Sequence, residues 1–174
     1  YAALGGSVLV METLIQAGLD FSARNKNGSN VLHIAALKNN LTVVKYFIAT
    51  YRQTLKETDN TGRTALHYAA LGGSVLVMET LIQAGLDFSA RNKNGTSVLH
   101  IAALQNNLTV VKYFIATYPQ TLKETDNTGQ TAQHYAALGG SVHVIETLKQ
   151  AEVHFTSRDN NGSNVLHIQQ FLIT

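Results

Sequence analysis

Cysteine is absent from this chain of 174 residues, and its absence excludes disulfide frameworks, thiolate metal sites and cysteine nucleophiles together. No run of apolar residues approaches the length of about 20 that a membrane-spanning helix needs. The first residues, YAALGGSVLV, lack the charged start and the cleavage pattern of a signal peptide. We therefore expect no membrane insertion and no targeting segment, and we favour a cytoplasmic location.

Charge is also scarce. Only 14% of the residues are charged, and the formal net charge is +2. These charges are too few and too scattered for nucleic-acid binding, which asks for a basic face with stacking aromatics. We therefore expect no nucleic-acid partner. Hydrophobic residues make up 45% of the chain, a globular composition with enough apolar surface to bury a core.

The chain repeats itself with a period of 67 residues. Residues 1–67 and 68–134 align without a gap, and a third, more altered copy begins at Tyr135. The first two copies differ at only six pairs of positions, which are Ser29/Thr96, Asn30/Ser97, Lys38/Gln105, Arg52/Pro119, Arg63/Gln130 and Leu66/Gln133.

Each copy is itself double. Turn glycines recur at steps of 34, 33, 34 and 33 residues, at Gly28, Gly62, Gly95, Gly129 and Gly162. A histidine follows each glycine after five residues, at His33, His67, His100, His134 and His167. A fixed period of this size is typical of a solenoid, in which each repeat buries its apolar face against its neighbours.

The segment DNTGRTALHYAALGGSVLVMETLIQAGLDFSAR, residues 59–91, shows the plan of one repeat. Asp, Asn and Gly favour a tight turn at its start, and Thr64 is then placed to cap a short first helix, ALHYAAL. Gly72 and Gly73 end this helix by offering a left-handed C-cap. A second helix is predicted over Val75–Gln83, because its apolar side chains recur at helical spacing.

The alternate repeat, residues 25–58, follows the same plan with two changes. Asn39 stands where Gly73 stands in the other repeat, and we expect it to end the first helix because asparagine tolerates the left-handed conformation. One extra residue lengthens the loop around residues 51–57, which explains the longer step of the period.

These segments resemble the ankyrin repeat, whose pattern is a turn with glycine, Thr-Pro-Leu-His, Ala-Ala, Gly, a helix rich in Val and Leu, and Gly-Ala-Asp. Here the pattern reads GRTALHYAALGG with LIQAGLDFSA, and GSNVLHIAALKNN with VVKYFIATY. The resemblance covers essentially the whole chain. It implies an all-α, ankyrin-type helix-turn-helix solenoid with β-turn or hairpin fingers, built from about five repeats of 33–34 residues in 67-residue double units.

The same resemblance sets the expected domain organisation, which is one ankyrin repeat domain over residues 1–174. Its repeats are expected at about 1–24 (partial), 25–58, 59–91, 92–125, 126–158 and 159–174 (partial). Two explanations of the incomplete end repeats compete: the chain is a fragment of a longer array, or it covers its ends by self-association.

Departures from the family pattern concentrate toward the C-terminus. The usual proline at the first helical position is replaced throughout, by Val31, Ala65, Val98, Ala132 and Val165. In the fifth repeat Gln133 takes a core leucine position, while Lys149, Glu152 and His154 replace Ile82, Gly85 and Asp87 of the preceding copy. Gln169 and Gln170 then fill positions that need small residues. We expect the fifth repeat to be the weakest.

The regular histidines invite a metal-site interpretation. Successive ones lie one repeat apart, about 10 Å for stacked helices, whereas zinc ligands lie about 2 Å from their ion. We therefore predict structural roles for His33, His67, His100, His134 and His167, each hydrogen-bonded to the cap residue three positions earlier, as in the Thr–His pairing of ankyrin repeats. His143 and His154 are assigned no metal or acid–base role. With no phosphate loop or nucleophile elbow either, we expect no catalytic residue, no cofactor and no enzyme activity.

In the proteins that this chain resembles, partners bind the concave side, which is formed by the turns and the first helices. Carried over, the turn positions are Lys26, Asn27, Ser29, Asn60, Thr61, Arg63, Lys93, Asn94, Thr96, Asn127, Thr128 and Gln130. The helix positions are Leu4, Leu37, Lys38, Leu71, Leu104, Gln105 and Leu138. The recurring leucine is either an exposed apolar stripe, which would mark an interaction site, or a buried contact within each repeat, and the sequence leaves both open.

We predict a non-enzymatic scaffold that binds a protein partner on this face. The near identity of the two copies suits a periodic or extended partner or another copy of the chain, unless it reflects only a recent duplication. The basic residues Arg24, Lys26, Arg63, Arg91, Lys93 and Arg158 could favour an acidic partner, although solvated charges are the ordinary explanation. The alternative function is a structural subunit that stacks head-to-tail through uncapped repeat ends, and a third is the recognition arm of a larger enzyme or channel.

Overall fold

The computed structural model describes residues 9, 13, 23–151 and 157–166. Within these residues the chain forms eight α-helices and two short 3-10 helices, and no β-strand. It divides into two compact units, Tyr1–Asn92 and Lys93–Thr174. The helical architecture confirms the predicted all-α fold class.

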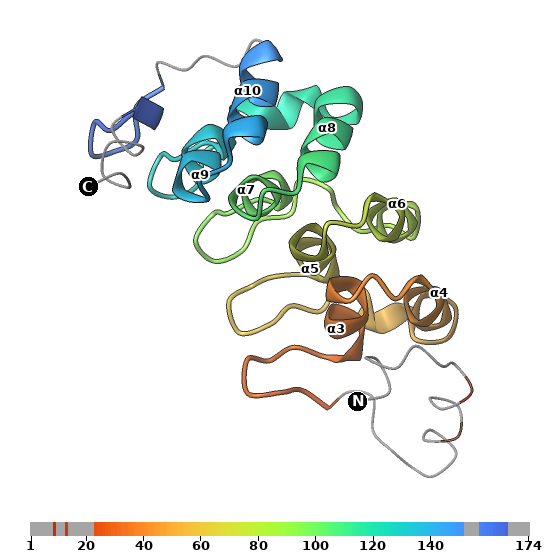
Figure 1. Cartoon of the computed structure of the whole chain (residues 1–174). Helices are drawn as coiled ribbons and strands as arrows, with labels where there is room; N and C mark the ends of the chain where they lie inside the picture. The colour runs from red at the N-terminus through yellow and green to blue at the C-terminus, as the bar shows by residue number, and fades with distance from the viewer. Residues whose placement is uncertain (1–8, 10–12, 14–22, 152–156, 167–174) are drawn as a thin grey trace. The chain divides into compact units, whose positions relative to one another are not determined.

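In the first unit, two helix pairs stand side by side (Figure 1). They are α3 (Val31–Leu37) with α4 (Leu41–Thr50) and α5 (Ala65–Gly72) with α6 (Val75–Gln83), and the 3-10 helix η1 (Arg52–Thr54) follows α4. Helix α3 packs against α5, and α4 packs against α6. The unit therefore has two layers, one of first helices and one of second helices.

The second unit repeats this arrangement. Its pairs are α7 (Val98–Leu104) with α8 (Leu108–Thr117) and α9 (Ala132–Leu138) with α10 (Val142–Gln150), and η2 (Pro119–Lys123) follows α8. Helix α7 packs against α9, and α8 packs against α10. None of the helices in the described parts of either unit is long and apolar enough to cross a membrane.

A reciprocal cap begins each first helix. In α3 the Asn30 side chain accepts a hydrogen bond from the backbone N–H of His33 at 3.0 Å, while the Asn30 N–H donates to Nδ1 of the same histidine at 3.1 Å. The N–H of Thr64 likewise donates to Nδ1 of His67 at 3.1 Å. This arrangement satisfies N–H groups that the start of a helix leaves without an intrahelical partner.

Left-handed residues end the first helices in the first unit as the sequence predicts. Gly73 has φ of 77° after α5, and Asn39 has φ of 56° after α3. In the second unit Asn106 takes the same left-handed conformation as Asn39, with φ of 55°. Non-glycine residues rarely adopt this conformation, and asparagine is among the few that tolerate it.

Small residues let neighbouring first helices approach closely. The alanine pair Ala69–Ala70 of α5 is completely buried. Gly72 lies so near α3 that a Cβ atom there would collide with the carbonyl oxygen of Leu37. The sequence predicted that Gly72 and Gly73 together stop α5, but only Gly73 is left-handed, and Gly72 is instead required for close helix packing.

Candidate protein-interaction surface

The fingers at residues 59–63 and 126–130 each end in a tight turn that is organised by one carboxylate. Oδ1 of Asp59 accepts hydrogen bonds from the backbone N–H of Thr61 at 2.8 Å and from that of Arg63 at 2.9 Å, and also from the Thr61 hydroxyl at 2.7 Å. Asp126 organises the equivalent turn in the second unit with distances of 2.8, 2.9 and 2.8 Å. The turn conformation is therefore fixed from within.

Asparagines join successive fingers. In the first unit, the N–H of Asn60 donates to the carbonyl of Asn27 at 3.0 Å, and its Nδ2 donates to the carbonyl of Lys26 at 3.1 Å. In the second unit Asn127 makes the same two bonds to Asn94 and Lys93. Asn60 and Asn127, predicted to contact a partner, thus have a side-chain donor already committed to the neighbouring finger.

A third asparagine of this kind was missed by the sequence reasoning. Asn160 donates from its backbone to the carbonyl of Thr128 at 2.9 Å and from its side chain to the carbonyl of Asn127 at 3.2 Å. The signal was the dipeptide Asp-Asn, which opens the turns at residues 59, 126 and 159.

A buried polar relay lies beneath the fingers. The Tyr68 hydroxyl donates to Oδ2 of Asp59 at 2.8 Å and lies 2.7 Å from the Ser29 hydroxyl of the preceding finger. Burial by itself raises the pKa of Asp59, but hydrogen bonds from Arg63, Thr61 and Tyr68 outweigh it, so the pKa of this carboxyl is below its usual value. Burial also raises the pKa of the Tyr68 hydroxyl.

The second unit has the same relay, and both relays change the predicted surface. Tyr135 donates to Asp126 at 2.8 Å, and its hydroxyl lies 3.1 Å from that of Thr96. Ser29 and Thr96 were expected at the partner-facing turns, but they are only 4% and 6% exposed. Both hydroxyls therefore form buried hydrogen bonds to a tyrosine and do not face a partner.

Three of the recurring histidines, His33, His100 and His134, each form a hydrogen bond to the following repeat. In His33, Nδ1 accepts a backbone N–H, so its proton lies on Nε2, which donates to the carbonyl of Glu57 at 3.2 Å. Burial lowers the pKa of His33. His100 bonds the carbonyl of Gln130 at 3.0 Å, and His134 that of Ser163 at 3.3 Å.

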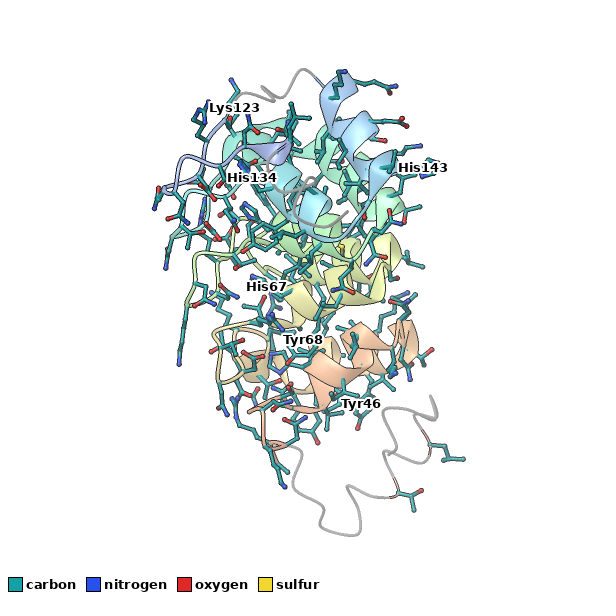
Figure 2. All side chains as sticks on the ribbon, turned by 60° about the vertical axis from the view of Figure 1, so that its left-hand side comes forward. Tyr46, His67, Tyr68, Lys123, His134 and His143 are labelled. Atoms are coloured by element: carbon teal, nitrogen blue, oxygen red, sulfur yellow. The ribbon has the colours of Figure 1, made fainter. Side chains whose placement is uncertain are left out.

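The remaining histidines take separate places. His67 is completely buried and lies beside Tyr68 in the interior of the first unit (Figure 2). His143 is exposed on α10, whereas His154 and His167 lie outside the described residues. No group of three or more His, Asp or Glu side chains that could hold a metal ion occurs within the part of the chain that the structure describes.

The predicted partner residues divide by exposure. Leu37, Leu71 and Leu104 are half-buried, Leu138 is 44% exposed and Leu4 lies outside the described residues. The recurring leucine is therefore neither a fully open stripe nor a buried contact. Arg63 and Gln130 are half-buried, and the exposed members are Lys26, Asn27, Lys38, Asn60, Thr61, Lys93, Asn94, Gln105, Asn127 and Thr128.

Comparison with known families agrees with this repeated geometry. A family model described as "Ankyrin repeats (3 copies)" matches residues 1–92 and 99–168, and one described as "Ankyrin repeats (many copies)" matches residues 72–115. The chain belongs to the ankyrin repeat family. Ankyrin repeats are generally non-enzymatic modules for protein–protein interaction.

Individual ankyrin proteins show the same likeness. The chain is 26% identical over 145 residues to the chicken nuclear factor NF-kappa-B p105 subunit, covering 82% of this chain and 15% of that protein. It is 31% identical over 118 residues to the palmitoyltransferase AKR1 of Lachancea kluyveri, covering 66% of this chain and 16% of that protein. The chain thus spans less than a fifth of either relative.

A solved structure is similar over almost the whole chain. A chain in the complex of a predatory endopeptidase from Bdellovibrio bacteriovorus with an immunity protein superimposes with a TM-score of 0.75 at 25% identity. The superposition covers 98% of this chain and 89% of that one. The ankyrin fold of the present chain therefore has a structural counterpart of nearly the same length.

Proposed function

We propose that this ankyrin chain is a non-enzymatic scaffold that binds a protein partner through its finger tips and first helices. The observation that carries the proposal is the combination of rigid fingers with exposed tips. Hydrogen bonds to Oδ1 of Asn25 fix the turn of the first finger, and Asn60 and Asn127 each hold the finger before them. The exposed tip residues are Lys26 and Asn27 of one finger and Lys93 and Asn94 of its copy. A rigid surface loses little conformational entropy when it binds.

The half-buried leucines support the same face. Leu37 and Leu71 lie on α3 and α5, which form the layer of first helices in the first unit, and Leu104 takes the equivalent place on α7. A partially exposed apolar side chain next to polar finger tips matches the usual anatomy of a protein interface, with an apolar centre and a polar rim.

The test is affinity capture with paired charge reversals. The immobilised chain is incubated with a lysate of the source cells, and bound proteins are identified by mass spectrometry. We expect Lys26→Glu with Lys93→Glu to lose a captured protein, since these lysines are at the finger tips. The matched control is Lys45→Glu with Lys112→Glu, which reverses two exposed lysines on the second helices α4 and α8. Equal losses in both variants would refute the assignment of this face.

We infer self-assembly as a second candidate function, because the second unit exposes large apolar side chains. Leu138, Val142 and Leu166 are 44%, 57% and 63% exposed, and exposed apolar side chains favour association when they form a contiguous patch. Light scattering over a wide concentration range tests this candidate. A mass that rises with concentration supports it, and a constant mass near 18.9 kDa refutes it.

A further inference from the structure

The two 67-residue copies differ in charge. At three of the six pairs of positions that distinguish them, a cation of the first copy is replaced by an uncharged residue; these pairs are Lys38/Gln105, Arg52/Pro119 and Arg63/Gln130. The other three pairs are uncharged in both copies. Every charge difference between the copies is therefore a cation that the first copy has and the second copy lacks.

Two of these cations lie on the finger and first-helix side of the first unit. Arg63 belongs to the finger at residues 59–63, whose Asn60 donates to the carbonyl of Lys26 in the preceding finger at 3.1 Å. Lys38 directly follows α3, which packs against α5. Figure 1 shows both fingers on the side of α3 and α5 and away from α4 and α6. We call Lys26, Lys38 and Arg63 the basic face of the first unit.

The carboxylates of the first unit do not neutralise the basic face. Glu57 forms an ion pair with Arg24 at 2.9 Å. Asp59 is buried, and its carboxylate accepts hydrogen bonds from the finger turn and from a tyrosine hydroxyl. The other two acidic residues among those described in this unit, Glu79 and Asp87, lie on α6 and after it. The exposed charge on the finger and first-helix side is therefore positive.

The cations of the basic face are not held by the described part of their own unit. Lys26 and Lys38 are exposed, as are the residues that replace them in the second unit, and neither lysine forms an ion pair with a described residue. The Nε of Arg63 makes no hydrogen bond. In the second unit, by contrast, the Gln130 amide that takes the place of Arg63 donates to Oδ2 of Asp159 at 3.4 Å.

The basic face is accompanied by apolar side chains but by no exposed aromatic ring. Leu37 and Leu71 on α3 and α5 are half-buried. Tyr68, the one Phe, Tyr or Trp of the described fingers and first helices of this unit, is only 7% exposed. Surfaces that bind single-stranded nucleic acid combine positive charge with aromatic rings on which bases stack. An acidic protein segment that also carries apolar side chains therefore fits this face better than nucleic acid does.

We propose that the basic face of the first unit binds an acidic segment of the protein partner, whereas the equivalent face of the second unit binds an uncharged segment. The inference rests on the proposed function and adds the chemistry of the partner. Complementary charge speeds association and fixes the register of a partner more than it adds affinity. The loss of cations from one copy thus gives two nearly identical surfaces different preferences.

The probe is a fluorescently labelled peptide in which leucines are interspersed among glutamates. Its anisotropy is measured against the whole 174-residue chain at about 0.1 M salt, where exposed charges more than about 10 Å apart are largely screened. Lys38→Gln with Arg63→Gln gives the first unit the residues of the second. We expect this double variant to bind the peptide about fivefold more weakly, because it removes two exposed ion pairs of modest strength.

The matched control removes two cations from the other side of the same unit. Lys45 on α4 and Arg52 at the start of η1 are both exposed, and Lys45→Gln with Arg52→Pro lowers the net charge by the same amount. We expect this control to change the dissociation constant by less than about twofold, since screening weakens the effect of distant charges. A peptide with glutamine in place of every glutamate should not bind the parent chain.

The variants should remain folded, because Gln105, Pro119 and Gln130 stand at the equivalent positions of the second unit. Thermal unfolding curves of all variants check this point. Lys38→Gln alone changes a single exposed side chain and is the second test. We expect it to weaken peptide binding about twofold, and an unchanged dissociation constant would contradict the inference.

The inference is wrong if the glutamine peptide binds as well as the glutamate peptide, or if the control weakens binding as much as the variant of the basic face. It is also wrong if a single-stranded oligothymidylate of equal charge displaces the labelled peptide better than unlabelled peptide does, because the face would then prefer nucleic acid. These failures would leave the proposed scaffold function standing, since that function is tested separately by capture through Lys26 and Lys93. A chain that binds the peptide but captures no protein through its finger tips would instead overturn the finger-tip assignment alone.

Discussion

The repeats at residues 59–91 and 126–158 lie one 67-residue period apart, and the second, most of which belongs to the more altered third copy, has the less complete helix core. In the first, Leu66 fills the core of α5, and the Ser74 hydroxyl accepts the N–H of Val77 at 3.3 Å to cap α6. In the second, Gln133 takes the core position, and the buried Ser141 hydroxyl makes no hydrogen bond.

What the two repeats share is equally informative. Both keep the Asp–Tyr pair beneath the finger, at Asp59 with Tyr68 and at Asp126 with Tyr135. The second repeat therefore keeps the hydrogen bonds under its finger although its helix core contains a buried glutamine. The proposed binding surface depends on rigid fingers more than on a fully apolar helix core.

The largest expected effect comes from the core position at which the repeats differ. Leu66→Ala should lower the free energy of unfolding by about 3 kcal/mol, because it removes a fully buried leucine and leaves a cavity. Gln133→Ala should cost clearly less, since the glutamine amide contributes less apolar burial. Urea unfolding followed by far-UV circular dichroism measures both, and equal costs would show that the two cores are equivalent.

The next effect tests what the repeats share. Asp59→Asn and Asp126→Asn should each cost about 2 kcal/mol, because the amide nitrogen that replaces Oδ2 cannot accept the tyrosine hydroxyl and the remaining hydrogen bonds lose their charge assistance. Similar values in the two units would support a preserved finger scaffold. A cost in one unit alone would contradict it.

These carboxylates also make the stability of the folded chain depend on pH. The pKa values of Asp59 and Asp126 in the folded chain are below the ordinary value of 3.8, so the unfolded chain binds their protons first as the pH falls. Their stabilising contribution is complete above pH 3.8 and is lost as the pH falls through the folded pKa. The free energy of unfolding of the parent chain should therefore fall between neutral pH and a pH below 3.8. The same change in pH should lower the free energy of unfolding of the Asp59→Asn, Asp126→Asn double variant by less.

A smaller gain is expected from restoring the core. Gln133→Leu should raise the free energy of unfolding by about 1 kcal/mol, because it replaces a buried amide with an apolar side chain of similar size. Amide hydrogen exchange should show slower exchange in α9 and α10 and no change in α5 and α6. Faster exchange in α9 would mean that the glutamine hydrogen bonds stabilise this repeat.

The sequence predicted the helices well, because period and caps are local signals. The boundaries predicted for α6 and the left-handed Asn39 are both found in the structure. The relay of Ser29, Tyr68 and Asp59 could not be predicted from the same signals, since it joins residues that are 39 and nine positions apart. Such a contact depends on how two repeats stack.

The surface was harder to predict for the same reason. Ser29 and Lys26 belong to one turn and are both polar, yet Ser29 is buried and Lys26 is exposed, because the neighbouring repeat covers one side of the finger. The ion pair of Arg24 with Glu57 was not predicted either, because it joins two repeats and no pattern along the chain indicates such a contact.

The smallest expected effect separates the two serine caps. Ser74→Ala should cost about 0.5–1 kcal/mol, because it removes the acceptor for the N–H of Val77 at the start of α6. Ser141→Ala should be neutral or slightly stabilising, since the hydroxyl that it removes is buried without a hydrogen bond. Paired thermal unfolding curves resolve a difference of this size when both variants are measured beside the parent chain. Equal losses would show that Ser141 caps α10 in solution as Ser74 caps α6, and the contrast between the two repeats would then rest on Gln133 alone.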